Sequence, residues 1–410
     1  MTHPDLRMPD GFGRDAAGRL LVAGRPAEDW VAETGGTPLF LYDPAIVAAH
    51  VCRLRRALPA GVAVHYAIKA NPFPPLLARM AALVDGFDVA SGGELARALA
   101  AGLSPERISF AGPGKRDSDL EAAIQAGITL VVESAGEATR ALAHAHRLGR
   151  RLRALLRVNP PFELRGSGLR MGGGARPFGV DADQAPGVLA RLKDPAVDFL
   201  GFHVFAGAQN LDWAAIAEAQ RATVALVAEL AAHAPGPVRL VNLGGGFGVP
   251  YFPGDRPLDV EALGAALART LADRPPPLRQ SAFALELGRW LVAEAGVYLA
   301  RILDRKTSGG ELFLVTDGGL HHVLAGTGNF GTVVRRNWPL VNASRAGPPF
   351  ETATVTGCLC TPLDRLAERL TIATGREGDL VALFLAGAYG RTASPEAFLG
   401  HPPPGERLAA

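Results

Sequence analysis

The sequence is poor in cysteine and lacks a long apolar run at its start. Cys52, Cys358 and Cys360 are the three cysteines of 410 residues, too few for a disulfide framework, so reduced thiols are expected. The Cys-x-Cys pair has no cysteine or histidine cluster at metal-site spacing, and no metal is predicted. Residues 1–25 contain no stretch typical of a signal peptide or a membrane span, which predicts a cytoplasmic protein without a membrane partner.

Excess charge is also absent. Lys and Arg together number 42 and Asp and Glu 40, a formal net charge of +2, without any basic run or aromatic-interleaved basic patch. Nucleic acid is therefore excluded as an expected partner. The hydrophobic content of 48% over this length predicts a large core, divided between two domains.

Apolar runs with strand character alternate with segments of helical period. The predicted strands are residues 62–68, 86–90, 107–111, 128–133, 152–158, 197–205, 238–243 and 282–286. The predicted helices between them are residues 75–83, 93–101, 117–126, 135–148, 183–192, 213–232 and 260–272. Eight parallel strands with crossover helices indicate an α/β fold, a closed (β/α)8 TIM-type barrel rather than an open doubly wound sheet.

The pattern changes after residue 286. Predicted strands follow at residues 292–303, 311–317, 353–357 and 379–386, with one helical stretch at 363–370. They indicate a C-terminal mostly-β domain, to which residues 20–22 and 38–42 are expected to add strands. The predicted domains are therefore a barrel at residues 37–286 and a β domain made of residues 1–36 with 287–410.

Lys69 stands at the polar end of the first predicted barrel strand, which Pro72 stops. An amine in that place is poorly solvated, which favours its neutral, nucleophilic form and makes Lys69 a candidate to form a Schiff base with an aldehyde. A lysine that extends out of a strand end into solvent is the commoner alternative for an isolated lysine.

Other polar residues gather where barrel chemistry is expected, at the carboxyl ends of the strands. They are Asp88, Glu133, Ser134, Arg157, Asn159, His203, Gly244, Gly245, Gly246, Glu286 and Arg289. The triple glycine follows the seventh strand, where its bare amides suit a phosphate group, with Arg289 as a second contact. A dinucleotide G-x-G-x-x-G fingerprint is excluded because position 249 is Val.

A Schiff-base lysine, a phosphate cradle and a carboxylate together indicate pyridoxal 5'-phosphate, with Glu286 paired to the ring nitrogen. Each residue also has a structural alternative. The glycines would then only form a tight turn, Glu286 would only bridge to Arg289, and Asp88 would cap the following helix.

The motifs resemble those of a known family, the fold type III, alanine-racemase-like pyridoxal-phosphate decarboxylases, which include diaminopimelate and ornithine decarboxylases. The resemblance extends from about Pro38 to His401. The matching motifs are Tyr66-Ala67-Ile68-Lys69-Ala70-Asn71, Phe87-Asp88-Val89-Ala90-Ser91-Gly92-Gly93-Glu94, Gly244-Gly245-Gly246-Phe247-Gly248, Glu286-Leu287-Gly288-Arg289, Cys360-Thr361-Pro362-Leu363-Asp364 and Gly387-Ala388-Tyr389-Gly390.

The resemblance implies roles for these residues. Lys69 would hold the cofactor as an internal aldimine, Tyr389 and the glycine loop would bind its phosphate, and Glu286 would contact the pyridine nitrogen. Cys360, arriving from the partner subunit of a homodimer, would protonate the carbanion left after carbon dioxide departs. The remaining expected cofactor contacts are Asp88, Arg157, Arg289, His203 in a polar role and Phe205 stacked on the ring.

Thr361 and Asp364 are the expected substrate contacts. Relatives that decarboxylate free diamino acids usually have an acidic residue where this chain has Thr361. Motifs such as Asp317-Gly318-Gly319-Leu320-His321-His322 are similar to those of the exosortase-associated and carrier-protein-glutamyl decarboxylases. The implied substrate is an α-amino acid, either a free small molecule or an aminoacyl group on an acyl carrier protein.

Two other functions are open on this scaffold. An amino-acid racemase would need a second base opposite Lys69, for which Tyr389 is the best candidate. A non-catalytic pyridoxal-phosphate-binding protein resembles the barrel alone, so the C-terminal domain counts against it. Release of carbon dioxide separates a decarboxylase from both.

Overall fold

A computed structural model describes residues 8–328 and 336–410 of the chain. Within these residues the chain forms two compact units. We call them the barrel unit (His50–Val249 and Arg256–Gly288) and the β unit (Met1–Ala49, Pro250–Asp255 and Arg289–Ala410). The predicted domain limits, 37–286 and 1–36 with 287–410, stay a prediction.

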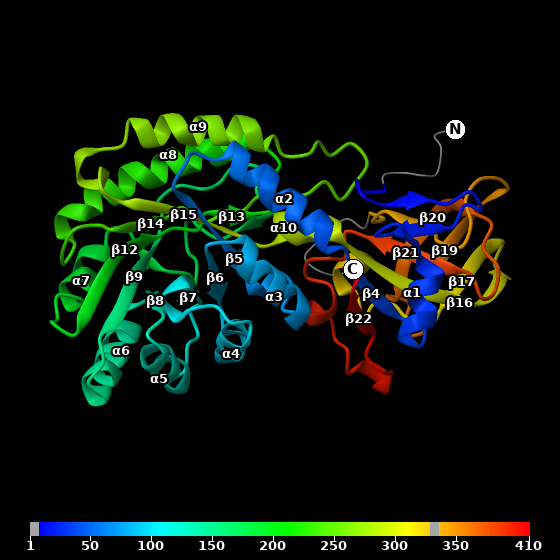
Figure 1. Ribbon diagram of the computed structural model, residues 1–410, viewed down its shortest axis with the longest axis horizontal. Coiled ribbons are helices and arrows are strands. Elements are labelled where there is room, and N and C mark those ends of the chain that lie inside the picture. Colours follow the sequence, from blue (N-terminus) through cyan, green and yellow to red (C-terminus); the bar gives the residue numbers. More distant parts are fainter. Residues whose placement is uncertain (1–7, 329–335) are drawn as a thin grey trace. The chain divides into compact units, whose positions relative to one another are not determined.

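Eight parallel strands close on themselves in the barrel unit (Figure 1). Their order is β9-β12-β14-β15-β5-β6-β7-β8, and β8 pairs again with β9, which confirms the predicted TIM-type barrel. The strands are β5 (Val62–Ala67), β6 (Gly86–Val89), β7 (Ile108–Phe110), β8 (Thr129–Val132), β9 (Leu152–Asn159), β12 (Val197–His203), β14 (Leu240–Asn242) and β15 (Ala282–Leu287). Parallel strands are covered on both faces, and every residue of β8 is accordingly buried.

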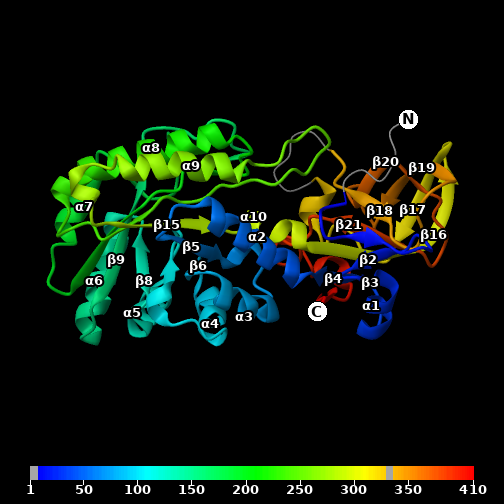
Figure 2. The ribbon, with the colours of Figure 1, turned by 45° about the horizontal axis from the view of Figure 1, so that its top comes forward.

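The predicted crossover helices are all present. They are α3 (Pro74–Leu83), α4 (Gly92–Ala100), α5 (Asp117–Ala126), α6 (Ala135–Leu148), α7 (Ala185–Arg191), α8 (Trp213–Leu230) and α9 (Val260–Ala272), and α2 (Pro44–Ala57) precedes β5. Side-chain caps start several of them. Ser91 accepts a hydrogen bond from the Glu94 amide at the start of α4, and Ser134 does the same for α6. Helices α8 and α9 lie side by side (Figures 1 and 2).

Short strands complete this unit. Strand β10 (Leu169–Arg170) pairs with β13 (Gly207–Ala208), and β11 (Val180–Asp181) extends the sheet beside β9. They lie in the loops that follow β9 and β12, at the end of the barrel where the carboxyl termini of the strands emerge.

The β unit contains an eight-stranded sheet. Its order is β18-β21-β16-β17-β19-β20, with β4 beside β16 and β22 beside β4. The strands are β4 (Leu39–Tyr42), β16 (Gly296–Ser308), β17 (Glu311–Thr316), β18 (Leu340–Asn342), β19 (Phe350–Thr356), β20 (Arg365–Ala373), β21 (Leu380–Phe384) and β22 (Gly405–Leu408). A smaller sheet and two helices complete the unit: β1 (Gly13–Arg14), β2 (Leu20–Val22), β3 (Arg25–Pro26), α1 (Ala27–Thr34) and α10 (Arg289–Val292).

One prediction about the β unit needs correction. The helix predicted at residues 363–370 is wrong, because β20 occupies most of it and pairs antiparallel with β19. Its Arg, Leu, Ala and Glu residues favour a helix locally, but pairing along β19 overrides that preference. Both N-terminal segments add strands to the β unit as expected, because residues 38–42 join the large sheet through β4 and residues 20–22 form β2 of the smaller sheet.

None of the described helices is long and apolar enough to cross a lipid bilayer.

Candidate active site

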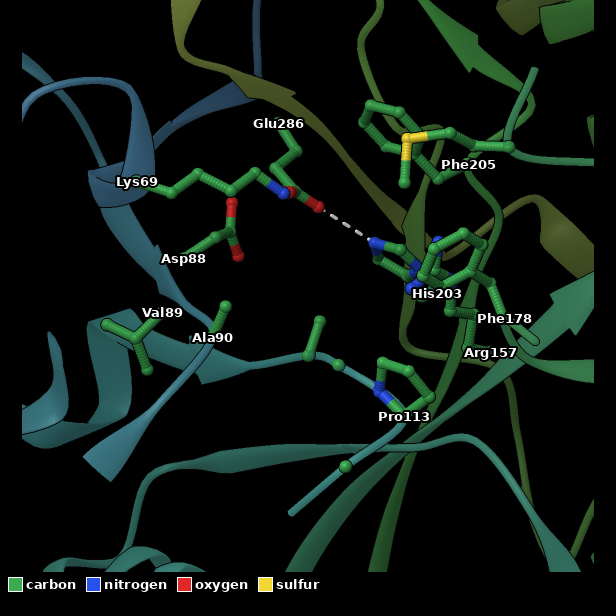
Figure 3. Close-up of a pocket in the computed structure, with 14 residues that line it drawn as sticks. Lys69, Asp88, Val89, Ala90, Pro113, Arg157, Phe178, His203, Phe205 and Glu286 are labelled. Atoms are coloured by element: carbon green, nitrogen blue, oxygen red, sulfur yellow. Dashed lines mark hydrogen bonds and ion pairs between the residues drawn. The ribbon is translucent and has the colours of Figure 1, made fainter. Parts of the chain in front are cut away.

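Lys69 and Glu286 face one another near the carboxyl ends of the neighbouring barrel strands β5 and β15 (Figure 3). Lys69 lies in a single 3-10 turn, Ile68–Ala70, directly after β5, and Glu286 lies on β15 opposite His65 of β5. The Lys69 Nζ atom is 3.9 Å from Glu286 Oε1. The lysine side chain is 42% exposed and the glutamate side chain only 5%, so the amine meets the cavity while the carboxylate is buried beneath it.

His203 fixes the other oxygen of Glu286. Its Nε2 atom lies 2.8 Å from Glu286 Oε2, at the end of β12. Burial alone raises the pKa of Glu286, but the hydrogen bond from His203 and the charges of Lys69, His203 and Arg157 outweigh burial and lower that pKa to about 2. Glu286 is therefore an ionised carboxylate at neutral pH.

Asp88 is the second carboxyl group of the cavity, and its pKa is shifted in the opposite direction to that of Glu286. It lies on β6, where Oδ1 accepts a hydrogen bond from the Ser109 hydroxyl and lies 3.5 Å from Nδ1 of His65. Burial, together with the negative charge of Glu286, raises the pKa of Asp88. Two neighbouring carboxyl groups whose pKa values are shifted in opposite directions are typical of active sites. The alternative role as a helix cap is wrong, because Ser91 caps α4.

Arg157 is held in place by a buried carboxylate. On β9 its Nη1 atom donates to Glu133 Oε1 over 2.9 Å, and Glu133 also accepts from the backbone amides of Gly112 and Gly179. The guanidinium carbon lies 5.0 Å from the centre of the Phe178 ring. Glu133 therefore ties the arginine to two loops that border the cavity.

A cavity of about 230 Å³ opens at the carboxyl ends of these strands (Figure 3). The predicted site residues that line it are Lys69, Asp88, Arg157, His203, Phe205 and Glu286. Lys69 Nζ lies 5.9 Å from the centre of the Phe205 ring. The structure thus brings six of the predicted residues together around one hollow.

The other lining residues were missed by the sequence analysis. They are Val89, Ala90, Ala111, Gly112, Pro113, Gly114, Met171 and Phe178. Most are apolar and lie in loops that follow β6, β7 and β9. The loop after β7 has no charged residue next to its strand end, but its position at the carboxyl end of a barrel strand is itself a signal for a site residue.

The triple glycine after β14 packs against the walls of this cavity without being among the residues that line it. A Cβ atom at Gly245 would overlap the carbonyl oxygen of Glu286, and one at Gly246 would overlap that of Gly207. Close packing of the turn therefore requires glycine at these positions, as the structural alternative for the glycine loop supposes. The Gly244 amide already donates to Asn242, so the predicted phosphate contact of this loop falls to Gly245 and Gly246.

Arg289 and Tyr389 lie together in the β unit. The Arg289 guanidinium carbon is 4.6 Å from the centre of the Tyr389 ring, and Nη1 donates to the Tyr251 hydroxyl over 2.7 Å. Burial by itself lowers the pKa of Arg289, but the two tyrosines raise it, so the guanidinium keeps its charge. A charged guanidinium beside two phenol groups is a suitable anion-binding group.

Cys360, Thr361 and Asp364 occupy the connection between β19 and β20. Cys360 is exposed on its own chain. Asp364 is 2% exposed, and its oxygens accept hydrogen bonds from the amides of Leu320 and Leu359 over 2.6 and 2.8 Å. Asp364 therefore holds the backbone of this unit in place. The substrate contacts expected from Thr361 and Asp364 stay predictions.

Comparison with known proteins identifies the family. The model "Pyridoxal-dependent decarboxylase, pyridoxal binding domain" matches residues 45–293. The L-glutamyl-[BtrI acyl-carrier protein] decarboxylase of Niallia circulans is 37% identical, over 91% of this chain and 88% of its own. The diaminopimelate decarboxylase of Deinococcus radiodurans is 34% identical, over 92% and 91% respectively. A crystal structure of diaminopimelate decarboxylase from M. jannaschii with L-lysine gives a TM-score of 0.89 at 25% identity, covering 98% of this chain and 93% of that one.

The site fits pyridoxal 5'-phosphate. An amine and an ionised carboxylate face the same cavity, as the aldehyde and the ring nitrogen of this cofactor require. Asp88 Oδ2 and His203 Nδ1 are buried without a hydrogen-bond partner among the described residues, so a polar ring in the cavity would give them partners. The racemase and the non-catalytic alternatives are set aside, because the named relatives are decarboxylases. The chain belongs to the pyridoxal-dependent decarboxylases and is a carboxy-lyase that uses pyridoxal 5'-phosphate.

Proposed function

We propose that this enzyme removes the α-carboxylate of an amino acid whose side chain is tethered to an acyl carrier protein. The observation that carries the proposal is the distribution of charge around the cavity. Among its described lining residues the acidic ones are Asp88 and Glu286, and both lie beside Lys69 (Figure 3). The walls away from Lys69 include Pro113 and Phe178, which have no charge to bind a distal ammonium group (Figure 3). A neutral acyl linkage suits these walls.

The relatives support both this substrate class and a second one. The Niallia circulans relative is named for a glutamyl group on a carrier protein. The Deinococcus radiodurans relative is named for free diaminopimelate, which makes a free diamino acid the second candidate. Thr361 at the position after Cys360 favours the first, because a hydroxyl group does not neutralise an ammonium.

The residues divide the chemical work as follows. When bound, the cofactor withdraws electrons from the substrate's α-carbon as the bond to the carboxylate breaks. Lys69 would hold the cofactor's aldehyde carbon. Glu286, kept ionised and oriented by His203, would hold a proton on the ring nitrogen, and Phe205 would cover one face of the ring.

The remaining roles concern the phosphate and the final proton. Gly245 and Gly246 would bind the phosphate through backbone amides, and the contacts expected from Arg289 and Tyr389 stay predictions. Cys360 of the partner subunit would protonate the α-carbon after carbon dioxide leaves. This role requires a homodimer, which we therefore propose as the active form. The cytoplasmic location stays a prediction.

The test is a mass-spectrometric comparison of substrates. The enzyme is offered a carrier protein loaded with a glutamyl group through its side-chain carboxylate, and separately free glutamate, lysine, ornithine, arginine and diaminopimelate. We expect the loaded carrier to lose the mass of carbon dioxide, with the free amino acids turned over much more slowly. Faster turnover of a free diamino acid than of the loaded carrier would contradict the proposal and favour the second candidate.

A Lys69→Ala variant is the matched control for this assay. It removes the amine without removing the cavity, and we expect no carbon dioxide from any substrate. Borohydride reduction of the wild-type holoenzyme should fix the cofactor to the peptide that contains Lys69. Labelling of a different lysine would refute the assignment of Lys69.

A further inference from the structure

Three potential metal ligands, to which the proposed decarboxylation assigns no role, meet in the β unit. The ligand atoms of His321, Cys358 and His401 all lie within 4.8 Å of one another. Cys358 Sγ is 3.9 Å from both ring nitrogens of His401, and the rings of His321 and His401 are 5.2 Å apart between centres. One thiol and two imidazoles therefore converge on a small volume.

The topology of the sheet explains how they meet. Strands β17 and β19 are parallel neighbours, with Val315 opposite Thr356. Because parallel strands end at the same edge of a sheet, the turn that carries His321 and the turn that carries Cys358 emerge side by side. His401 follows the short 3-10 turn Phe398–Gly400 and reaches the same place.

A second observation points to a missing ligand. His321 is completely buried, with 0% of its surface exposed, and neither ring nitrogen has a hydrogen-bond partner among the described residues. Burying two imidazole nitrogens without partners is costly, and such groups are rare in folded proteins. A metal ion bonded to one of these nitrogens would remove part of that cost.

The neighbouring histidine shows the contrast. The ring of His322 lies 3.7 Å from that of His321, but its Nδ1 atom is 3.0 Å from the Tyr298 hydroxyl and its Nε2 atom is 3.1 Å from the carbonyl oxygen of Pro402. Both of its nitrogens are thus occupied. The unsatisfied imidazole is the one that faces the thiol.

The turns that carry two of the ligands are held rigidly. One carboxylate, that of Asp364, accepts hydrogen bonds from Leu320, next to His321, and from Leu359, next to Cys358. A Cβ atom at Gly319 or Gly357 would overlap this carboxylate, so the packing around it is tight. A site held in this way before the ion arrives needs little rearrangement to bind it.

We propose that His321, Cys358 and His401 form a binding site for a zinc-class divalent metal ion. Two imidazoles and one thiolate are ligands that zinc prefers, and three protein ligands leave a fourth tetrahedral position for water. Binding forms the sulfur–metal bond and releases the thiol proton to solvent. All three ligands belong to the β unit, and the proposed decarboxylation requires none of them.

Metal content of the untagged holoenzyme is the first test. After incubation with zinc and removal of free metal, we expect about one zinc per chain by elemental mass spectrometry. The variants Cys358→Ser, His321→Ala and His401→Ala should lose it, whereas Cys52→Ser and Cys360→Ser should retain it. No retained zinc in the wild type would overturn the proposal, as would zinc retained by Cys358→Ser.

Cobalt provides a spectroscopic readout of the ligands. Difference spectra of the cobalt-loaded against the zinc-loaded holoenzyme cancel the absorption of the cofactor. We expect a thiolate-to-cobalt charge-transfer band and the intense visible bands of tetrahedral cobalt, both absent in Cys358→Ser. A charge-transfer band that disappears in Cys360→Ser and persists in Cys358→Ser would overturn the assignment.

The wild type alone also tests the site if a histidine variant fails to fold. Its thermal unfolding temperature should rise on addition of zinc and fall on addition of a chelator, since a ligand that binds the folded state stabilises it. The Cys358→Ser variant should show neither change. Equal responses of wild type and Cys358→Ser would place the metal elsewhere and refute the proposal.

Discussion

His203 and Glu286 share a buried hydrogen bond of 2.8 Å that sets the charge of the cavity floor. The bond leaves Glu286 Oε1 facing Lys69 and, together with nearby positive charges, keeps the carboxylate ionised. The glutamate is therefore oriented and charged by the protein itself.

Removing that charge should slow decarboxylation. In Glu286→Gln the side chain keeps its size but cannot hold a proton on the ring nitrogen. We expect the rate constant kcat to fall by about 10²–10³-fold, as when one electrostatic stabiliser is lost from an active site. Initial rates of carbon dioxide release measure it. Glu218→Gln, on the exposed face of α8 beside Arg221, is the control and should leave the rate unchanged.

Glu286 should also make stability depend on pH. The pKa of Glu286 falls from 4.5 to about 2 on folding. Its contribution to the free energy of unfolding is therefore fully present above pH 4.5 and is lost as the pH falls through about 2. The contribution is on the order of 3 kcal/mol. The difference in free energy of unfolding between wild type and Glu286→Gln should therefore be largest near neutral pH and shrink in acid. Urea unfolding at several pH values measures it, and a gap that widens in acid would contradict the assignment.

Gly245 should not tolerate a side chain. Because a Cβ atom there would overlap the carbonyl oxygen of Glu286, Gly245→Ala must displace either the glycine loop or β15. We expect a loss of about 1–3 kcal/mol in the free energy of unfolding and weaker retention of the cofactor. Gly187→Ala on α7 is the control, since its Cβ would meet nothing within 4 Å. That change should be neutral or stabilise by up to about 1 kcal/mol.

Cys360→Ser tests the proton donor. A hydroxyl is a much weaker acid than a thiol, so product formation should slow by about 10²–10⁴-fold while cofactor binding persists. Absorption of the bound cofactor and product analysis by mass spectrometry measure both effects. Cys52→Ser, an exposed cysteine on α2, should be silent. Wild-type rates and the normal amine product in Cys360→Ser would show that another group supplies the proton.

Subunit exchange tests the shared site. Lys69→Ala and Cys360→Ala should each be inactive, but a mixture of the two should recover activity, because a mixed dimer contains one site with both native residues. The recovery should depend on the time allowed for exchange. An absence of recovery in dimers shown to have exchanged would mean that both residues of a site come from one chain.

The barrel could be predicted because the burial of each strand leaves a pattern in the sequence of that strand alone. Parallel strands buried on both faces read as continuous apolar runs, and β8 shows this in its four buried residues. The sequence could also place four site residues near one another, because each lies at or just after the carboxyl end of a barrel strand. They are Lys69, Asp88, His203 and Glu286. The prediction for β20 was wrong because the composition of this segment favours a helix, and only its pairing with β19 makes it a strand.

Contacts formed by loops could not be predicted. The Glu133 carboxylate binds Arg157 together with the amides of Gly112 and Gly179, and nothing in their sequence positions indicates that meeting. His321, Cys358 and His401 are equally dispersed, and Cys358 and His401 are 43 positions apart in the sequence. Sequence spacing predicted no metal there, because the parallel pairing of β17 and β19 brings His321 and Cys358 together and His401 joins them from a distant turn.

The double hydrogen bond of Asp364 has a dynamic consequence. The turns after β17 and β19 share this one acceptor, so neither can open without exposing a buried carboxylate that the other still holds. The amide hydrogens of Leu320 and Leu359 should therefore exchange with solvent as one cooperative unit, with matched protection. The connection that carries Cys360 thus begins from a rigid anchor at Leu359, and the motion of its thiol is confined to the few residues between Leu359 and Asp364.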